Sequence, residues 1–157
     1  GSDPQAAGYR LTERRKGKMI IGTIINGIVI DHIPAGRGMA IYGYLRLDEL
    51  ECEVALIKNA ASKKYGKKDI IKINGILCLD FDILGYWDPC ITVNIISGGI
   101  RVKKLHPSLP ETITDMIFCK NPRCITSTEQ ELPHVFRLSD RENGVYRCIY
   151  CGTRAER

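Results

Sequence analysis

The sequence of 157 residues lacks the features that mark several common protein classes. No apolar run approaches the roughly 20 residues of a membrane-spanning helix, so we expect no membrane association. There is no GxxxxGK[ST] loop and no GxGxxG turn, which excludes P-loop and Rossmann nucleotide sites. Cys52, Cys78 and Cys90 have no nearby histidine to act as a base. We therefore expect these three cysteines to fill the core and not to catalyse.

Disulfide bonds are not favoured either. No apolar signal segment is present, and the seven cysteines are an odd number, which indicates the reducing cytoplasm. Four cysteines instead follow the spacing C-x4-C-x23-C-x2-C: Cys119, Cys124, Cys148 and Cys151. Two close pairs of this kind can direct four thiolates at one Zn²⁺, which we prefer to the alternative of two disulfides. Four thiolates fill a tetrahedral shell, so the predicted zinc is structural and cannot activate water.

Charge is distributed unevenly along the chain. Residues 108–157 contain seven Lys/Arg and seven Asp/Glu, whereas residues 1–107 contain sixteen and eleven and account for the net charge of +5. A zinc domain that binds nucleic acid normally carries the basic patch itself. The neutral zinc segment therefore speaks against nucleic acid as a partner.

Composition also predicts the domain boundaries. Residues 1–18 lack apolar periodicity and begin with Gly1-Ser2, which resembles a cloning remnant, so we expect a disordered extension without function. Pro107 and Pro110 favour an extended connector. We predict one domain at 19–106, a connector at 107–111 and a zinc-binding domain at 112–157.

The pattern after residue 18 predicts strands interleaved with two short helices. In the first domain, strands are expected at 19–25, 28–30, 50–57, 69–73, 91–96 and 100–105, with loops at 31–36 and 63–68 and a turn at Ser97-Gly98-Gly99. One helical pattern puts Met39, Tyr42 and Leu45 on one face, and a weaker one spans 79–86. The zinc segment is expected to hold three strands, around 112–118, 134–138 and 145–149. This order predicts an α+β fold with helices on one face of a sheet, followed by a small all-β domain.

Several polar residues of the first domain suit a ligand with a polyphosphate and a ribose: Asp31, His32, Lys72, Asn94 and Lys104. Lysines supply point charges for phosphates. Lys72 lies between Ile71 and Ile73, so the three side chains should alternate between the two faces of a strand. Plainer explanations remain open: solvent-facing lysines, a turn or cap role for Asp31 and a hydrogen-bonded loop position for His32.

Five segments together carry a resemblance to a known family: residues 30–36 (IDHIPAG), 66–73 (GKKDIIKI), 92–94 (TVN) and 107–110 (PSLP), and the four-cysteine spacing. They lie in the same order as in the regulatory chain of aspartate carbamoyltransferase, which the sequence resembles over roughly residues 19 to 151. The resemblance implies a ferredoxin-like nucleotide-binding domain and a small zinc-ribbon-like (rubredoxin-like) domain. It also implies a non-catalytic chain that forms homodimers, docks on a catalytic chain and transmits CTP inhibition and ATP activation in pyrimidine biosynthesis. UTP is a further candidate ligand.

The resemblance also implies site residues. Asp31 and Lys72 correspond to positions at the ribose and base, and His32, Asn94 and Lys104 to positions near the triphosphate. Three isoleucines line the rest of the nucleotide site, Ile21 and Ile24 through backbone groups and Ile96 through its side chain. Asn121 corresponds to a contact with the catalytic chain. Three residues depart from the family pattern: Gly99, Arg101 and Arg123 stand where members carry Tyr, Val and Asn.

Two other functions remain as alternatives. A nucleic-acid-binding zinc-ribbon protein is disfavoured by the neutral zinc segment and by the lack of basic residues interleaved with exposed aromatics. An enzyme using Asp31 and His32 as an acid–base pair lacks a recognisable nucleophile or an open metal site.

Overall fold

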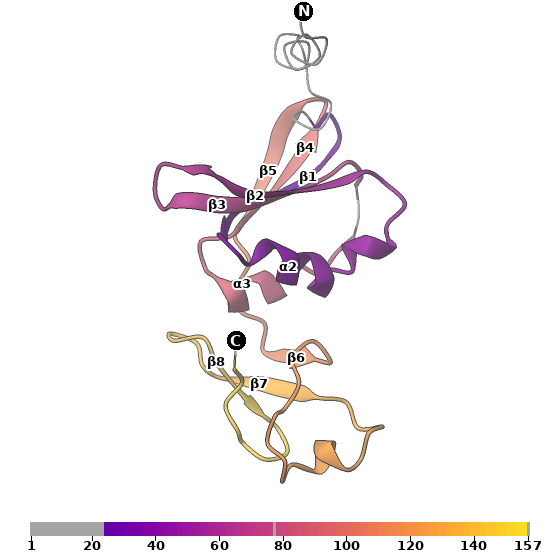
Figure 1. Cartoon of the computed structure of the whole chain (residues 1–157), viewed down its shortest axis with the longest axis vertical. Helices are drawn as coiled ribbons and strands as arrows, with labels where there is room; N and C mark the ends of the chain where they lie inside the picture. Colours follow the sequence, from indigo (N-terminus) through magenta and orange to yellow (C-terminus); the bar gives the residue numbers. More distant parts are fainter. Residues whose placement is uncertain (1–23, 77, 157) are drawn as a thin grey trace, which may run out of the picture. The chain divides into compact units, whose positions relative to one another are not determined.

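The computed structural model describes residues 24–76 and 78–156, which divide into two compact units. Unit 1 holds the described residues up to Leu79 together with Thr92–Leu105, and unit 2 holds Asp80–Ile91 and the residues from His106 onward. In chain order (Figure 1), the elements are β1 (Gly27–Pro34), α2 (Gly38–Tyr44), a 3-10 turn η1 (Leu47–Glu49), β2 (Val54–Ser62), β3 (Gly66–Ile73), α3 (Ile83–Trp87), β4 (Thr92–Ser97), β5 (Ile100–Leu105), β6 (Thr112–Thr114), a second 3-10 turn η2 (Ile125–Ser127), β7 (Val135–Asp140) and β8 (Val145–Cys148).

Unit 1 is built on a five-stranded antiparallel sheet with the strand order β2-β3-β1-β4-β5. The chain order from β1 to β4, with a helix after β1 and another after β3, is that of a ferredoxin-like fold, and β5 extends the sheet at one edge. The turn between β4 and β5 depends on Gly98 and Gly99, with φ of 62° and 78°. A two-residue hairpin turn of type I′ needs positive φ at both positions, which glycine adopts without strain.

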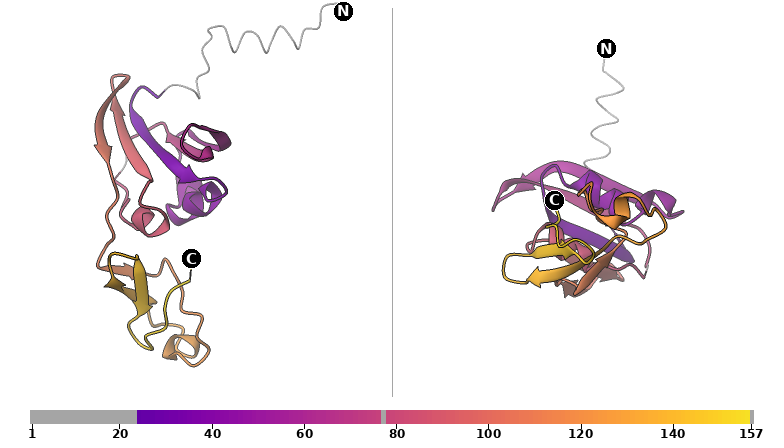
Figure 2. Two further views of the ribbon diagram at one scale, coloured as in Figure 1. Left: turned by 90° about the vertical axis from the view of Figure 1, so that its left-hand side faces the viewer. Right: turned by 90° about the horizontal axis from the view of Figure 1, so that it is seen from below.

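The core of unit 1 lies between the sheet and α2, which covers one face (Figure 2). Period-two alternation sends Ile28 and Ile30 of β1, and Ile71 and Ile73 of β3, to this face, where each is at most 1% exposed. Ile41 of α2 is fully buried, and α2 contacts β2 and β3. The intervening residues of β1 and β3 therefore project from the other face, which we call the open face.

Unit 2 contains the three-stranded antiparallel sheet β6-β7-β8. Ile113, Phe136 and Tyr146 supply its buried centre. Tyr86 of α3 packs edge-on against Tyr146 with ring centroids 5.3 Å apart, and the Tyr146 hydroxyl donates a hydrogen bond to the Pro110 carbonyl. The sheet carries the four-cysteine cluster on its turns, so unit 2 is a small zinc-ribbon-like domain with one short helix attached.

Most of the expected strands are present. The structure confirms the strands expected over 91–96 and 100–105 to within one residue at the ends, whereas the strand expected at 69–73 begins three residues earlier, at Gly66. The three short strands of the zinc segment are present, but the first, expected around 112–118, is only Thr112–Thr114. The expected strand at 19–25 lies mostly outside the described residues, and Ile24 and Ile25 belong to no strand.

Several expectations were wrong. Cys52, Cys78 and Cys90 do not fill the core, since Cys78 is exposed and the other two are half-buried. The expected loop at 31–36 is strand as far as Pro34, because β1 continues to pair with β3 beyond a bulge at Asp31 and His32, although its pairing with β4 ends at Asp31. The expected strand at 50–57 begins only at Val54, so Cys52 precedes it. The expected helix is present as α2, but Met39, Tyr42 and Leu45 do not form its buried face: Leu45 is buried just beyond the helix, whereas Met39 is 60% exposed and Ile41 is the residue directed inward.

The compact units differ from the predicted domain ranges in one segment. Asp80–Ile91, expected within 19–106, belongs to unit 2, because Gly85 lies against the Pro107 backbone and Tyr86 against Tyr146. The domain ranges stay a prediction, and the proposed extension at 1–18 lies outside the described residues. In the described part of the chain, no helix is long and apolar enough to cross a membrane.

Candidate functional site

One row of residues crosses the open face of the sheet in direct register. Lys72 on β3 pairs with Val29 on β1, Val29 with Asn94 on β4, and Asn94 with Lys104 on β5. The expected alternation at Lys72 is confirmed, since Ile71 and Ile73 on either side are fully buried. Three of the predicted nucleotide-binding side chains therefore share one face of the sheet, although they come from three strands.

Two further predicted residues form the bulge of β1. The pairing of β1 with β3 shifts register between Ile30 and Ile33, and His32 takes a left-handed conformation with φ 59°. The inserted residue returns Ile33 to the core and leaves Asp31 and His32 half-buried at the edge of the open face. The His32 backbone N–H donates to Asp31 Oδ1 (2.6 Å), and His32 Nδ1 lies 3.1 Å from Thr92 Oγ1. The bulge thereby fixes both side chains.

These residues line a cavity of about 180 Å³ that lies wholly within unit 1. Its lining is Val29, Asp31, His32, Thr92, Asn94, Ile96, Arg101 and Lys104. Five of the eight predicted nucleotide-binding residues are thus brought together. Lys72 and Ile24 line a separate small hollow with Glu53, Ala55 and Asn74, and Ile21 lies outside the described residues.

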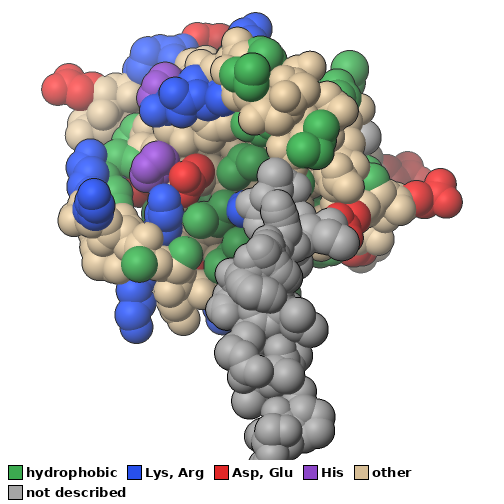
Figure 3. Space-filling model, turned by 90° about the horizontal axis from the view of Figure 1, so that it is seen from above, with side chains coloured by type: hydrophobic (Ala, Val, Ile, Leu, Met, Phe, Trp, Pro, Cys, Tyr) green, Lys and Arg blue, Asp and Glu red, His purple; other side chains and the backbone are tan. Residues whose placement is uncertain are grey.

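The charge balance of this cavity includes a residue that the sequence analysis missed. Lys68 Nζ lies 2.9 Å from Asp31 Oδ1 in a partly buried ion pair. Lys68 had been placed in a loop, but β3 begins at Gly66 and Lys68 pairs with Pro34 of β1. Because Lys68 compensates the charge of Asp31, the cavity keeps the positive charges of Arg101 and Lys104. The open face, seen in Figure 3, gathers Lys and Arg side chains around histidine and acidic groups.

In the sequence, Arg101 was noted only as a departure from the family pattern, which has Val at this position. Its side chain instead lines the cavity, with Nη1 3.5 Å from Asn94 Oδ1. Lys103 pairs with Ile95 and Lys104 with Asn94, so Lys104 and not Lys103 projects from the open face. Only the strand register decides between these adjacent lysines.

The four cysteines of unit 2 form the second candidate site. Their Sγ atoms all lie within 4.8 Å of one another, with Cys119 3.6 Å from Cys151 and Cys124 3.7 Å from Cys148. These separations are far from the roughly 2.05 Å of a disulfide. Metal–sulfur bonds of about 2.3 Å in a tetrahedron place sulfur atoms about 3.8 Å apart. The four side chains therefore fit a four-coordinate metal and leave no position open.

Turns and side chains around the cluster hold the thiols in place. The Cys119 backbone N–H donates to His134 Nδ1 (3.1 Å), and Thr126 Oγ1 donates to Cys124 Sγ (3.1 Å). Hydrogen bonding from Thr126 lowers the pKa of the Cys124 thiol, whereas burial raises the pKa of Cys119 to about 12. Burial opposes ionisation of Cys151 as well, but hydrogen bonds, chiefly with Thr153, outweigh it and lower the Cys151 pKa to about 6.

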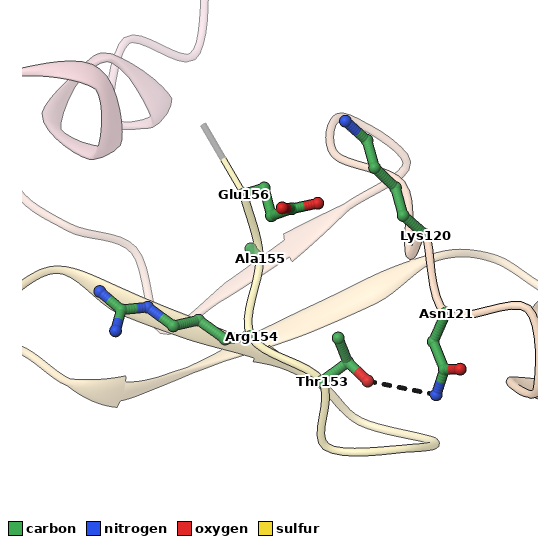
Figure 4. A pocket seen from close by; sticks show the side chains of 6 residues that line it. All are labelled: Lys120, Asn121, Thr153, Arg154, Ala155 and Glu156. Atoms are coloured by element: carbon green, nitrogen blue, oxygen red, sulfur yellow. Dashed lines mark hydrogen bonds between the residues drawn. The ribbon is translucent and has the colours of Figure 1, made fainter.

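Asn121, the predicted partner contact, lies between the first two cysteines on the rim of a surface hollow. Its Nδ2 donates to Thr153 Oγ1 (3.2 Å), as Figure 4 shows. The hollow measures about 620 Å³ and is lined by Lys120, Asn121, Thr153, Arg154, Ala155 and Glu156. The loop between Cys119 and Cys124 therefore faces solvent beside charged side chains of both signs.

Two family models match successive parts of the chain. The family model described as aspartate carbamoyltransferase regulatory chain, allosteric domain, matches residues 19–108. The model described as aspartate carbamoyltransferase regulatory chain, metal binding domain, matches residues 111–157.

Relatives of nearly the same length carry the same name. An aspartate carbamoyltransferase regulatory chain from Clostridium botulinum is 53% identical over 133 residues, covering 85% of this chain and 91% of the relative. One from Clostridium tetani is 52% identical over 134 residues, covering 85% and 93%. One from Bifidobacterium longum is 44% identical over 138 residues, covering 88% and 99%. The chain therefore belongs to the family of aspartate carbamoyltransferase regulatory chains, with the allosteric and metal-binding domains of that family and a regulatory, not a catalytic, role.

Proposed function

We propose that this chain binds CTP and ATP in the cavity of unit 1 and transmits their effect to the catalytic chains of aspartate carbamoyltransferase in pyrimidine biosynthesis. The observation that carries the proposal is the convergence of His32, Asn94, Arg101 and Lys104 from three strands on one cavity. Two cations, an amide and an imidazole are suited to a polyphosphate. The half-buried Asp31 carboxylate beside them is suited to ribose hydroxyls. UTP shares these groups and is a third candidate ligand.

The isolated chain provides the direct test of this binding site. Calorimetric titration of the purified chain with CTP, ATP and UTP should give saturable binding that weakens as phosphates are removed. A chain that binds none of the three would contradict the proposal. Filter binding with DNA and RNA serves as the comparison, because a nucleic-acid-binding protein would retain both and respond little to free nucleotide.

We propose zinc as the metal of the four-cysteine cluster. An all-thiolate tetrahedral shell is the usual structural zinc site, and four cysteine ligands complete its coordination. The residues would hold Zn²⁺ through Sγ of Cys119, Cys124, Cys148 and Cys151, and its contribution would be to the folding of unit 2. Metal analysis of the purified chain should find one zinc per chain, and its absence would reject this assignment.

We propose that unit 2 docks on the catalytic chain through the turns that carry the four cysteines. Four large apolar side chains adjacent in sequence to the cysteines are exposed: Phe118, Ile125, Ile149 and Tyr150. Exposed apolar groups gathered at one end of a small domain are typical of an interaction site. Asn121 lies on the rim of the hollow at this end, with its carbonyl Oδ1 accepting from the Arg123 N–H and its Nδ2 turned to Thr153. These groups favour a protein partner over a small ligand.

We also propose a homodimer formed through the domain at 19–106 and a cytoplasmic location, where thiols stay reduced. Among the described residues, the sheet of unit 1 ends in β2 on one side and in β5 on the other, and each has one edge without a neighbouring strand. Such edges offer backbone groups for pairing with a second copy. Sedimentation of the isolated chain should give twice the mass of one chain, and a monomer at micromolar concentration would contradict the dimer.

A further inference from the structure

Arg101 reaches the nucleotide cavity because of an irregularity in β5. The pairing of β4 with β5 shifts register, so that Ile95 faces Lys103 while Ile96 faces Arg101, and Val102 is left without a partner. In a regular strand, residues three apart point to opposite faces. The extra residue reverses this alternation, and Arg101 and Lys104 both project from the open face.

The position of the guanidinium is set by a side chain that is itself held in place. Asn94 is only 8% exposed, and its Nδ2 donates to the Val29 carbonyl (3.3 Å). This bond turns Asn94 Oδ1 toward Arg101, whose Nη1 lies 3.5 Å away. One amino group of Arg101 is thus held weakly by Asn94, and the other donors of the guanidinium remain available to a ligand in the cavity.

The charges around the cavity define the chemistry of that ligand. Lys68 pairs with the Asp31 carboxylate at 2.9 Å. Within the described part of the chain, no carboxylate pairs with Arg101 or with Lys104. The cavity therefore presents two cations of β5, Arg101 and Lys104, that no carboxylate compensates, together with His32. Such an arrangement favours a ligand with several negative charges.

We propose that Arg101 contacts a phosphate group of the bound nucleotide and, with Lys104, makes affinity depend steeply on the number of phosphates. This inference rests on the proposed nucleotide site and assigns Arg101 a part that its backbone position alone would not give. The planar fork of a guanidinium can donate two parallel hydrogen bonds to phosphate oxygens, whereas Lys104 acts as a point charge. The alternative is that Arg101 contacts a base carbonyl, which would change base preference and leave phosphate dependence intact.

The test compares CTP, CDP, CMP and cytidine in calorimetric titrations of the full metal-loaded chain. The quantity measured is the ratio of the CMP to the CTP dissociation constant. Arg101→Gln should reduce this ratio by about 10- to 100-fold, since it removes a charge-assisted hydrogen bond, and should leave cytidine binding unchanged. The ratio for Arg101→Lys should lie between those of the wild type and Arg101→Gln, because lysine keeps the charge but cannot donate two parallel hydrogen bonds.

Lys103→Gln is the matched control. It removes the same charge from the same strand, but Lys103 pairs with Ile95 and does not line the cavity, so its ratio should equal that of the wild type. An Arg101→Gln chain with a wild-type ratio, or with an altered CTP-to-ATP preference only, overturns the inference while the nucleotide site stands. A wild-type chain that binds no CTP overturns the proposed nucleotide site and with it this role of Arg101. Thermal midpoints of all variants check that each is folded.

Discussion

Asp69 should be the residue of unit 1 that tolerates change least, although it contacts no proposed ligand. Its side chain is fully buried, and its carboxylate accepts three backbone hydrogen bonds. Oδ2 accepts from Gly36 N–H (3.1 Å) and Gly38 N–H (2.9 Å), and Oδ1 from Asn59 N–H (3.0 Å). The β2–β3 pairing shifts register between Ile57 and Ala60, which places Asn59 in a bulge of β2. The carboxylate thereby connects this bulge, and the segment between β1 and α2, to strand β3.

Asp69→Asn keeps the size of the side chain and removes one acceptor. In the more favourable orientation of the new amide, its oxygen accepts the hydrogen bonds from the Gly36 and Gly38 N–H groups. Its NH₂ group then faces the Asn59 N–H, and this third bond cannot form. One charge-assisted bond worth about 1.5–3 kcal/mol is then lost, and two others fall to the strength of neutral bonds, about 1 kcal/mol less each. The free energy of unfolding of unit 1 should fall by about 4 kcal/mol, a large part of the roughly 5–15 kcal/mol of an ordinary domain.

Two signals separate the units in a urea titration. The single tryptophan, Trp87, lies in unit 2, so its fluorescence follows that unit, while far-UV circular dichroism also follows the large sheet of unit 1. Asp69→Asn should move the dichroism transition to lower urea and leave the Trp87 transition in place. Asp48→Asn, at an exposed carboxylate of η1, is the control and should change neither. A loss below 1 kcal/mol for Asp69→Asn would refute the reasoning.

Three further predictions concern the metal, the cavity and the Tyr146 hydroxyl. Complete removal of the metal, or Cys119→Ser, should unfold unit 2 and change Trp87 fluorescence while the sheet of unit 1 persists, because structural zinc supplies roughly 10–16 kcal/mol; a folded unit 2 without metal contradicts this. Lys104→Ala and Lys72→Ala should each raise the CTP and ATP dissociation constants by about 10- to 100-fold in calorimetry, and only Lys104→Ala should reduce the discrimination between triphosphate and nucleoside. Wild-type affinity in both would reject the site. Burial raises the pKa of Tyr146 to about 12, so the folded unit retains the neutral phenol and its stability should fall as pH rises from about 10 toward 12. Tyr146→Phe should lower the unfolding free energy by about 1 kcal/mol at pH 8 and should make its loss at alkaline pH smaller. Urea titrations of both proteins at pH 8 and 11 measure this loss, and an equal loss in the wild type and the variant would contradict the assignment.

Residues whose role depends on local pattern were predictable from the sequence. The spacing of four cysteines alone indicated one metal cluster, and their Sγ atoms converge as expected. Alternation alone put Lys72 on the face opposite Ile71 and Ile73, both of which are fully buried. Both inferences need only the geometry of a turn or a strand, which a few neighbouring residues determine.

Residues whose role depends on strand pairing were not predictable in the same way. His32 was placed in a loop because nothing in the local sequence reveals that β1 continues through a bulge. The Asp31–Lys68 pair joins residues 37 positions apart, and the side chain of Arg101 enters the cavity only because β5 carries one extra residue. A bulge reverses the facing of every residue beyond it, so the pairing partner has to be known first.

The regulatory role itself is tested most directly by reconstitution with the catalytic chains of aspartate carbamoyltransferase. Allosteric control requires that nucleotide bind with different affinity to the two states of the catalytic assembly. Aspartate saturation curves of the reconstituted complex should shift with CTP and with ATP, while the isolated catalytic chains should give the same curve with and without nucleotide. Identical curves for the complex with and without either nucleotide would contradict the regulatory role, even if calorimetry shows that both nucleotides bind.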